Sequence, residues 1–328
     1  MIDIYAEIGK RKLIVEEYLD ELFDKKDEHR LWELMSIYPM AGGKKFRPFL
    51  AMISAGALGV EEEKALHLGV CIELIHNFTL VHDDIMDDDD LRRGVETVYK
   101  REGISSAINT GDALFALAFE VLSRTDIEVN NLRDLLKEVA SSVVRVAEGQ
   151  EEDMRFERSF DITEEEFISM IEKKTSCLFQ ACTRGGAIVA GASEEQREGM
   201  GEYARKMGIA FQIQDDYLDL AGDQDEIGKP VGSDIKGGKR TLIIIQALKV
   251  LPGEKRERLV EILSCTNNTE SEVKEALDML RKCGALDYAR NTAEKYAKQA
   301  KEELNILPES EYRDILDTLV DLMIKRTN

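Results

Sequence analysis

Residues 66–90 read LHLGVCIELIHNFTLVHDDIMDDDD, an apolar stretch that ends in a run of aspartates. Its apolar side chains recur three and four positions apart, which predicts a long and largely buried helix over about residues 64–87. A helix turns by about 100° per residue, so Asp83 and Asp87 share one face. Two carboxylates held this close repel each other unless a cation lies between them. The stretch therefore predicts a helix that ends in a cation-binding face.

The same spacing returns in a second cluster, Asp215-Asp216-Tyr217-Leu218-Asp219, which also follows an apolar stretch with helical spacing. An isolated acidic run is usually a solvated surface or the start of a helix, but two matching clusters favour metal binding. Neither cluster has the alternating oxygen ligands, central glycine and final glutamate of an EF-hand. Magnesium prefers oxygen ligands, and it completes its octahedron with water and substrate phosphate. We therefore expect a magnesium–diphosphate site built between helices.

The composition is that of a helical globular protein. Of the 328 residues, 43% are hydrophobic and only five are proline. We find neither strand-like alternation nor a repeat at a solenoid period, and no linker rich in proline, glycine or serine. We expect one large all-α domain over residues 1–328. Helices are expected at about residues 8–36, 44–58, 64–87, 104–123, 131–156, 163–191 and 195–221, with a connector at 91–102 and a loop at 222–240.

The net charge of −21 argues against a nucleic-acid partner, which would need an excess of basic residues. It also disfavours broad attachment to anionic lipid. No apolar run approaches the length of a membrane span, and the N-terminus lacks the basic and apolar regions of a secretory signal. The five cysteines form no CxxC pair and suit free thiols in a reducing compartment. We therefore expect a cytoplasmic protein without an integral membrane segment.

Basic motifs near the first cluster can neutralise the remaining oxygens of a diphosphate. In GGKKFRP, residues 42–48, the paired glycines allow the backbone to approach an anion, and Lys44 and Arg47 can face that anion together. Arg92-Arg93-Gly94 follows the aspartates directly. Taken alone, the first motif could be an ordinary helix start, and the second could simply compensate the acidic run.

A third basic motif, GKPVGSDIKGGKRT at residues 228–241, follows the second cluster. A P-loop would need serine or threonine after its lysine, and Arg240 occupies that position, so the nucleotide-binding motif fails. His76 lies seven residues before Asp83, on nearly the same helical face. A lone histidine is more often structural, but this direction favours a role at the site.

In order and spacing, these motifs resemble those of the trans-isoprenyl diphosphate synthases, the family of farnesyl and geranylgeranyl diphosphate synthases. Phe46 and Lys45 stand where the family often has leucine and arginine, and both departures are mild. The resemblance rests on GGKKFRP at 42–48, LIHNFTLVHDDIMDDDDLRRG at 74–94, GQEEDM at 149–154, KT at 174–175, GIAFQIQDDYLD at 208–219 and GKPVGSDIKGGKRT at 228–241.

The resemblance implies an isoprenoid synthase-like, all-helical fold around a deep central cavity, and usually a homodimer. It implies magnesium-dependent condensation of isopentenyl diphosphate with an allylic diphosphate, with more than one Mg²⁺ ion at the site. A terpene cyclase would not need a second diphosphate site, so the residues assigned to that site argue against a cyclase. An inactive partner subunit could lose an aspartate cluster, whereas this chain has both clusters. By this resemblance the metal ligands are Asp83, Asp84, Asp87, Asp215 and Asp219; the catalytic residues are Asp83, Asp84, Asp87, Asp215 and Lys174; isopentenyl diphosphate is bound by Lys44, Arg47, His76 and Arg93; and the allylic diphosphate is bound by Arg92, Lys174, Thr175, Gln212, Asp216, Lys229 and Lys239.

Product length is expected to depend on residues just before the first cluster. In the resembling family, an aromatic residue at the fifth position before the first aspartate tends to limit chain length. Phe78 occupies this position, whereas Thr79 is small. We therefore expect mainly geranylgeranyl diphosphate, the alternative being a farnesyl or a bifunctional synthase. An ideal helix places Thr79 and Ile75 nearer to Asp83, so either the helix is distorted or Phe78 reaches the cavity from the side.

Overall fold

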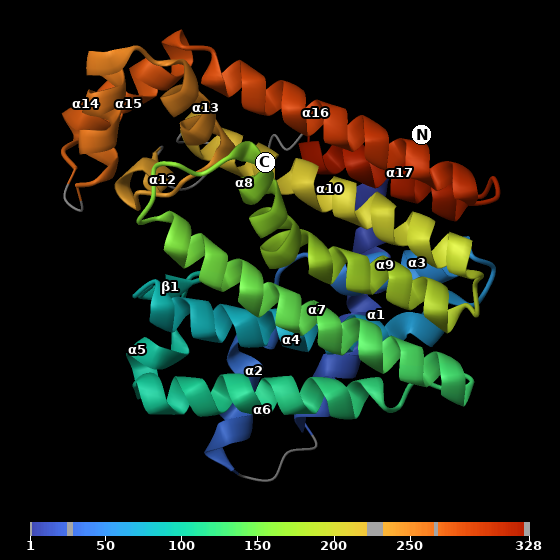
Figure 1. The fold of residues 1–328 in the computed structure, drawn as a ribbon. Helices are drawn as coiled ribbons and strands as arrows, with labels where there is room; N and C mark the ends of the chain where they lie inside the picture. Colours follow the sequence, from blue (N-terminus) through green and yellow to red (C-terminus); the bar gives the residue numbers. More distant parts are fainter. Residues whose placement is uncertain (1, 25–28, 222–231, 266–267, 325–328) are drawn as a thin grey trace. The chain divides into compact units, whose positions relative to one another are not determined.

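The computed structural model describes residues 2–24, 29–221, 232–265 and 268–324, which form helices and one short hairpin (Figure 1). The expected all-α class is confirmed. The backbone contacts define two compact units. Unit 1 comprises residues 1–143, 178–201 and 306–316, and unit 2 comprises residues 144–177, 202–305 and 317–328. The expectation of a single domain over residues 1–328 stays a prediction.

Three long helices contain the boundaries between the units: α7 (Val129–Phe156), α10 (Glu194–Ala221) and α17 (Glu311–Ile324). A fourth helix, α9 (Cys177–Val189), also contains a boundary, because Cys177 belongs to unit 2 and the rest of the helix belongs to unit 1. The other elements of unit 1 are α1 (Ile4–Asp24), α2 (Arg30–Met40), α3 (Phe46–Ala57), the 3₁₀ turn η1 (Glu62–Ala65), α4 (Leu66–Met86), β1 (Leu91–Arg92), β2 (Val95–Glu96), α5 (Val98–Glu102) and α6 (Ile104–Leu122). Those of unit 2 are α8 (Glu164–Ile171), the π-helix η2 (Glu172–Ser176), α12 (Ser233–Lys236), α13 (Leu242–Val250), α14 (Gly253–Leu263), α15 (Glu270–Lys282), α16 (Ala285–Glu303) and most of the 3₁₀ turn η3 (Leu304–Ile306).

Helix α4 is the core helix of unit 1 and carries the first aspartate cluster. It is closely packed: a Cβ atom on Gly69 would lie 2.8 Å from the Cα atom of Pro48 in α3. Contrary to our expectation that no apolar run approaches a membrane span, the segment Glu62–Met86 is long and apolar enough for one. However, 61% of its most apolar window is buried inside the protein, as in the core helix of a folded domain.

The connector at residues 91–102 contains a β-hairpin that the sequence did not predict. Leu91 pairs with Glu96, and Arg92 pairs with Val95, in antiparallel register. The two turn residues, Arg93 and Gly94, have φ angles of 52° and 79°. Positive φ at both central positions is what a two-residue type I′ turn requires.

Unit 2 is held together by an apolar core around α13, whose Leu242, Ile243 and Ile244 are buried against α14, α15 and α16. Two capping boxes fix where its helices begin. Thr163 and Glu166 cap α8, and Thr269 and Glu272 cap α15, each by reciprocal side-chain and backbone hydrogen bonds.

Candidate active site

The first aspartate cluster lies at the C-terminal end of α4. The N–H of Asp87 donates to the carbonyl of Asp83 at 2.8 Å, so the two residues keep the helical i, i+4 relation that the sequence predicted. The C-terminal end of a helix carries the negative pole of its dipole, which disfavours carboxylates and favours a cation. The second cluster lies in the same position on α10, which ends at Ala221. Each unit therefore has a helix end at which acidic side chains need a positive partner.

Asp84 differs from Asp83 and Asp87 because it is fully buried. Its Oδ1 atom accepts a hydrogen bond from Arg92 Nε at 2.7 Å and a second from Arg92 Nη2. Its Oδ2 atom accepts a hydrogen bond from the hydroxyl of Tyr38. Burial and this hydrogen bond raise the pKa of Tyr38, which keeps the hydroxyl a donor. The role of Asp84 as a metal ligand stays a prediction, and in this structure both of its oxygens hold protein groups.

Three of the four residues assigned to isopentenyl diphosphate lie close together in unit 1. Burial, followed by the nearby cations of Arg47 and Arg93, lowers the pKa of His76 well below its usual value, so the imidazole is neutral. The guanidinium of Arg47 lies over the ring of Phe179, 5.2 Å from its centroid. That of Arg93 lies 3.5 Å from where a Cβ atom on Gly43 would stand, so glycine leaves room for it.

The fourth member of this set, Lys44, is exposed next to the two glycines. Its neighbour Lys45 is buried instead, and its ammonium group donates to the carbonyl of Pro39 and pairs with Glu73 at 3.2 Å. Of the two adjacent lysines, Lys44 is therefore available to a ligand, whereas Lys45 has a structural role.

In unit 2, Asp215 is exposed, whereas Asp216 is buried. Burial, and then the carboxylates of Asp234 and Asp215, raise the pKa of Asp216 well above its usual value. Asp219 accepts hydrogen bonds from the hydroxyl of Ser233 and from the N–H of Asp234, the latter at 3.0 Å. Lys239, which pairs with Asp234 at 3.2 Å, offsets part of this negative charge.

A pocket of about 150 Å³ in unit 2 brings the predicted diphosphate-binding residues together. Lys174 pairs with Asp153 at 2.5 Å, and the hydroxyl of Thr175 donates to Gln212 at 2.9 Å. The wall contains five of the seven residues assigned to the allylic diphosphate, which are Lys174, Thr175, Gln212, Asp216 and Lys239. Of the other two, Arg92 lies in unit 1, and Lys229 lies outside the described residues.

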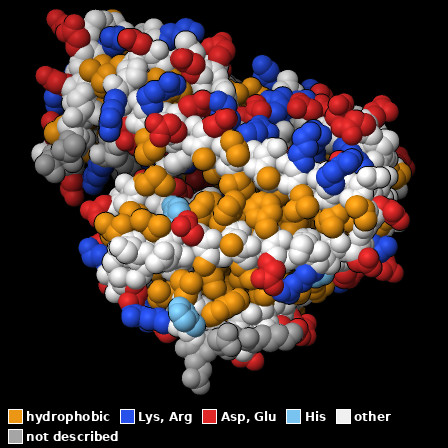
Figure 2. Space-filling model, turned by 60° about the horizontal axis from the view of Figure 1, so that its bottom comes forward, with side chains coloured by type: hydrophobic (Ala, Val, Ile, Leu, Met, Phe, Trp, Pro, Cys, Tyr) orange, Lys and Arg blue, Asp and Glu red, His pale blue; other side chains and the backbone are white. Residues whose placement is uncertain are grey.

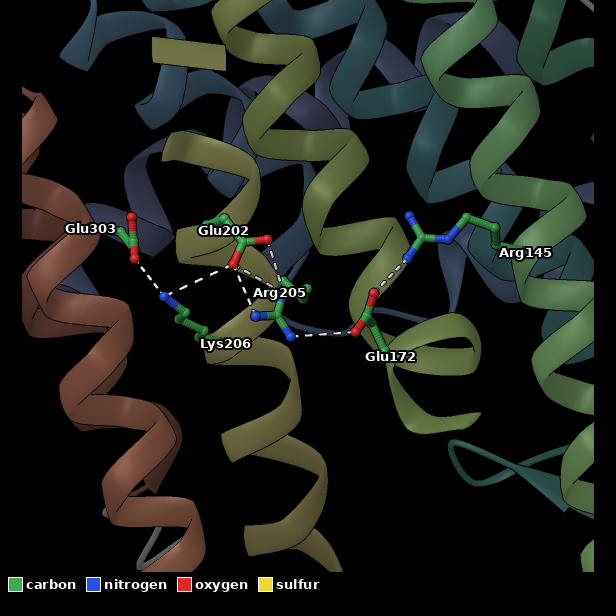
Figure 3. Close-up of polar contacts among 6 residues, drawn as sticks. All are labelled: Arg145, Glu172, Glu202, Arg205, Lys206 and Glu303. Atoms are coloured by element: carbon green, nitrogen blue, oxygen red, sulfur yellow. Dashed lines mark hydrogen bonds and ion pairs between the residues drawn. The ribbon is translucent and has the colours of Figure 1, made fainter. Parts of the chain in front are cut away.

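Lys174 and Thr175 are part of the π-helix η2, a local widening that is frequent at functional sites. The π-helix packs tightly on α7, because a Cβ atom on Gly149 would lie 2.4 Å from the backbone nitrogen of Lys174. Its first residue, Glu172, pairs with Arg145 at 3.1 Å and with Arg205 at 3.3 Å. Figure 3 shows that this ion-pair network continues from Arg205 through Glu202 and Lys206 to Glu303.

Comparison with known proteins identifies the family. A sequence model of the polyprenyl synthetase family matches residues 28–280. The chain belongs to the polyprenyl synthetase family. A short chain isoprenyl diphosphate synthase of Methanothermobacter thermautotrophicus is 44% identical over 287 residues, 87% of each chain. A geranylgeranyl pyrophosphate synthase of Geoglobus acetivorans is 40% identical over 319 residues, which cover 97% of this chain and 98% of that one.

Solved structures agree with this assignment. The crystal structure of geranylgeranyl pyrophosphate synthetase from Pyrococcus horikoshii Ot3 has a TM-score of 0.94 at 40% identity and covers 99% of this chain and 98% of that chain. Polyprenyl synthase from Caulobacter crescentus CB15, complexed with calcium and isoprenyl diphosphate, has a TM-score of 0.88 at 28% identity, with 99% and 98% covered. This polyprenyl synthetase is therefore a trans-prenyltransferase, as its motifs indicated.

The residues expected to set product length lie on a regular helix. Helix α4 is an unbroken α-helix from Leu66 to Met86, so the first explanation for the position of Phe78, a distorted helix, is wrong. The ring of Phe78 packs against that of His82 at 4.9 Å and that of Phe115 in α6 at 5.3 Å. Ile75 is fully buried, and the hydroxyl of Thr79 donates to the carbonyl of His76 at 2.9 Å. Their roles in chain length stay predictions.

Several polar residues near the site were not assigned from the sequence. Asp153 and Asp234, the partners of Lys174 and Lys239, lie inside motifs that the resemblance already used, so their motifs were the signal. Tyr38 had no such signal, because it is a lone aromatic residue 46 positions before its partner Asp84.

No three His, Cys, Asp or Glu side chains within the described ranges are arranged to hold a metal ion by themselves. Magnesium does not require such a cage, because it usually takes one or two carboxylates and completes its shell with water and substrate phosphates. The exposed and half-buried carboxylates of Asp83, Asp87 and Asp215 fit that donor chemistry.

Proposed function

We propose that this polyprenyl synthetase is a magnesium-dependent geranylgeranyl diphosphate synthase, which condenses isopentenyl diphosphate with allylic diphosphates. The observation that carries the proposal is the pocket of unit 2, where the residues assigned to the allylic diphosphate meet. Relatives at 38–40% identity described as geranylgeranyl synthases support the product. The Caulobacter relative, bound to calcium and isoprenyl diphosphate, supports a divalent cation beside a prenyl diphosphate.

In this proposal, Asp83, Asp87 and Asp215 hold magnesium, assisted by Asp84 and Asp219, and more than one ion serves the same allylic diphosphate. When bound, magnesium neutralises negative charge on the leaving diphosphate. The raised pKa of Asp216 supports a cation here, since added positive charge would favour its ionised form.

The protein groups fix the leaving diphosphate. Lys174, Lys239 and Arg92 donate to its oxygens, and Thr175 and Gln212 hold each other beside them. Donors fixed in advance stabilise charge as it develops, because they need no reorganisation when the carbon–oxygen bond breaks. The double bond of isopentenyl diphosphate attacks the resulting allylic cation. A proton then leaves, and we assign the departing diphosphate as its acceptor.

The isopentenyl diphosphate is bound by Lys44, Arg47, His76 and Arg93. The neutral imidazole of His76 supplies a hydrogen bond without adding charge, which suits a group surrounded by arginines. This substrate keeps its diphosphate, so its site needs steady binding and no help with bond cleavage.

We assign geranylgeranyl diphosphate as the main product and farnesyl diphosphate as a lesser one. The contact of Phe78 with Phe115 of α6 supports a position from which its ring would narrow the path of the growing chain from the side. Thr79 and Ile75 would line the same path. A farnesyl or bifunctional enzyme is the alternative, and product analysis separates the two.

We infer that the enzyme is a cytoplasmic homodimer that binds neither nucleic acid nor a lipid bilayer as an integral protein. A second copy of the chain fits the exposed apolar side chains Ile104 and Ile108, which lie one helical turn apart on α6. Figure 2 shows hydrophobic side chains gathered on the face where α6 comes forward. An apolar surface of this kind is typical of an interface between subunits.

The test is incubation of the purified protein with labelled isopentenyl diphosphate and each allylic primer in turn, with magnesium or with a chelator. Chromatography should show a twenty-carbon diphosphate as the main product, and the chelator should abolish it. A fifteen-carbon end product would correct the chain length. Absence of any condensation product with magnesium would overturn the proposed function and favour an inactive partner subunit.

A further inference from the structure

Tyr38 lies near the end of α2, and the residue is 1% exposed. Its hydroxyl donates to Oδ2 of Asp84 and accepts the N–H of Val98 at 3.2 Å. Val98 is the first residue of α5, so its N–H is one of the donors that a helix start leaves without an intrahelical partner. Both hydrogen-bonding functions of the hydroxyl are therefore used inside the protein.

The partner of this hydroxyl, Asp84, is the carboxylate that fixes Arg92. Arg92 Nε donates to Asp84 Oδ1 at 2.7 Å, Nη2 donates to the same atom, and Nη2 also pairs with Asp89 at 2.9 Å. Arg92 is partly exposed, whereas Asp84 is fully buried. The carboxylate is thus an interior anchor, and the hydroxyl of Tyr38 holds the side of it that Arg92 does not use.

The backbone of Tyr38 contacts the other arginine of the hairpin. Arg93 Nη1 donates to the carbonyl oxygen of Tyr38 at 3.1 Å. Arg93 has the left-handed conformation at the hairpin turn, and its guanidinium contacts the backbone of Tyr38, whereas that of Arg92 contacts Asp84. One residue of α2 therefore supports both arginines, through different atoms.

We propose that Tyr38 is a positioning residue that orients Arg92 through Asp84 and Arg93 through its own carbonyl. The proposal rests on the proposed function, in which Arg92 binds the allylic diphosphate and Arg93 binds isopentenyl diphosphate. The hydroxyl contacts Asp84, which holds Arg92, but it does not contact Arg93. Its removal should therefore weaken binding of the allylic diphosphate and leave binding of isopentenyl diphosphate unchanged.

Tyr38→Phe removes the hydroxyl, and with it the hydrogen bonds to Asp84 and from Val98, while phenylalanine keeps the ring and the backbone carbonyl that holds Arg93. The variant leaves Asp84 Oδ2 without its tyrosine donor, so the carboxylate turns and Arg92 loses its fixed direction. A hydrogen bond to a charged group corresponds to a change of about tenfold in binding. The expected result is an apparent KM for geranyl diphosphate raised about tenfold, with the KM for isopentenyl diphosphate changed less than twofold.

The matched control is Tyr99→Phe. The hydroxyl of Tyr99 also donates to an aspartate of the same run, Asp88 Oδ1 at 2.7 Å, but this pair is exposed and holds neither arginine. The control should keep both KM values within twofold of wild type. Thermal unfolding of all three proteins shows whether either change damages the fold.

The same comparison is made without turnover by titrating inorganic diphosphate into the three proteins in a calorimeter, with magnesium present. Tyr38→Phe should weaken binding about tenfold, and Tyr99→Phe should not. Equal changes in both KM values, or equal behaviour of the two variants, would overturn the positioning role. A wild-type protein that does not condense substrates would overturn the proposed function, and the calorimetric comparison would still decide the role of Tyr38.

Discussion

At the residue scale, His76 shows how surroundings select a protonation state. Burial and neighbouring cations lower its pKa, the facing charged groups being Arg47, Arg93, Lys45 and Arg92. In the proposed isopentenyl diphosphate site, such an imidazole would add specificity through hydrogen bonding, while the arginines would provide the charge. The sequence indicated the direction of His76, but the neutral state depends on cations from two other segments, the motif at residues 42–48 and the hairpin.

The neutral state has a consequence for stability. A histidine whose folded pKa lies below its unfolded value of about 6.5 binds fewer protons when folded, so stability falls as pH falls through that value. His76→Gln removes this penalty, and the variant should lose less unfolding free energy than wild type between pH 7 and pH 5. The difference in slope is at most about 1.4 kcal/mol per pH unit, the value for one proton. Urea unfolding at several pH values measures it, and parallel curves would contradict a neutral His76.

At the element scale, the π-helix depends on its packing. Its first residue, Glu172, forms ion pairs with Arg145 of α7 and Arg205 of α10, as Figure 3 shows. No sequence pattern marked the widened turn, because it arises where Gly149 lets the backbone of Lys174 approach. The family resemblance did single out Lys174 and Thr175, the two residues of the KT motif in this turn.

Glu172→Gln tests whether the ion pairs hold the turn. The change removes the charge of a partly buried pair on both sides, which should lower stability by about 1 kcal/mol and raise the KM for the allylic substrate several-fold. Glu202→Gln is the control, because Glu202 pairs with Arg205 and Lys206 but lies outside the π-helix. Equal KM values for the two variants would show that the network has no effect on Lys174.

Helix α4 and helix α6 form the aromatic contact that we expect to control product length. Phe78→Ala removes the ring that meets Phe115, so the product should lengthen beyond twenty carbons. Thr79→Phe adds bulk on the neighbouring position and should shorten the product to fifteen carbons. Chromatography of dephosphorylated products checks both. If neither variant changes the length, the limiting residues lie on another helix.

At the scale of the whole molecule, the sequence predicted the all-α class, the positions of most helices and the family. Those features follow from hydrophobic period and motif order, which are local. The hairpin at Arg93 and Gly94, and the bond between Tyr38 and Asp84, were missed because they depend on turn geometry and long-range contacts. The candidate residues were thus predictable, and the groups that orient them were not.

The proposed dimer gives a prediction at this scale. Ile108→Asp places a charge on the apolar face of α6, so it should convert a dimer into a monomer at micromolar concentration. Leu13→Asp, on the exposed surface of α1, is the control and should leave the assembly unchanged. Sedimentation equilibrium distinguishes the two, and an unchanged mass for Ile108→Asp would exclude this face.

In the proposed function, the aspartate clusters of α4 and α10 both bind magnesium for one allylic diphosphate. The most direct test measures condensation by Asp83→Ala, by Asp215→Ala and by the double variant, with Asp90→Ala as a control that loses only an exposed ion pair to Lys100. Each single change should lower turnover about a thousandfold, and the double variant should be little worse, since residues that act as a unit are not additive. Circular dichroism should show an unchanged helical fold, and Asp90→Ala should keep its activity. Near wild-type turnover in either Asp83→Ala or Asp215→Ala would show that the two clusters do not act together in catalysis.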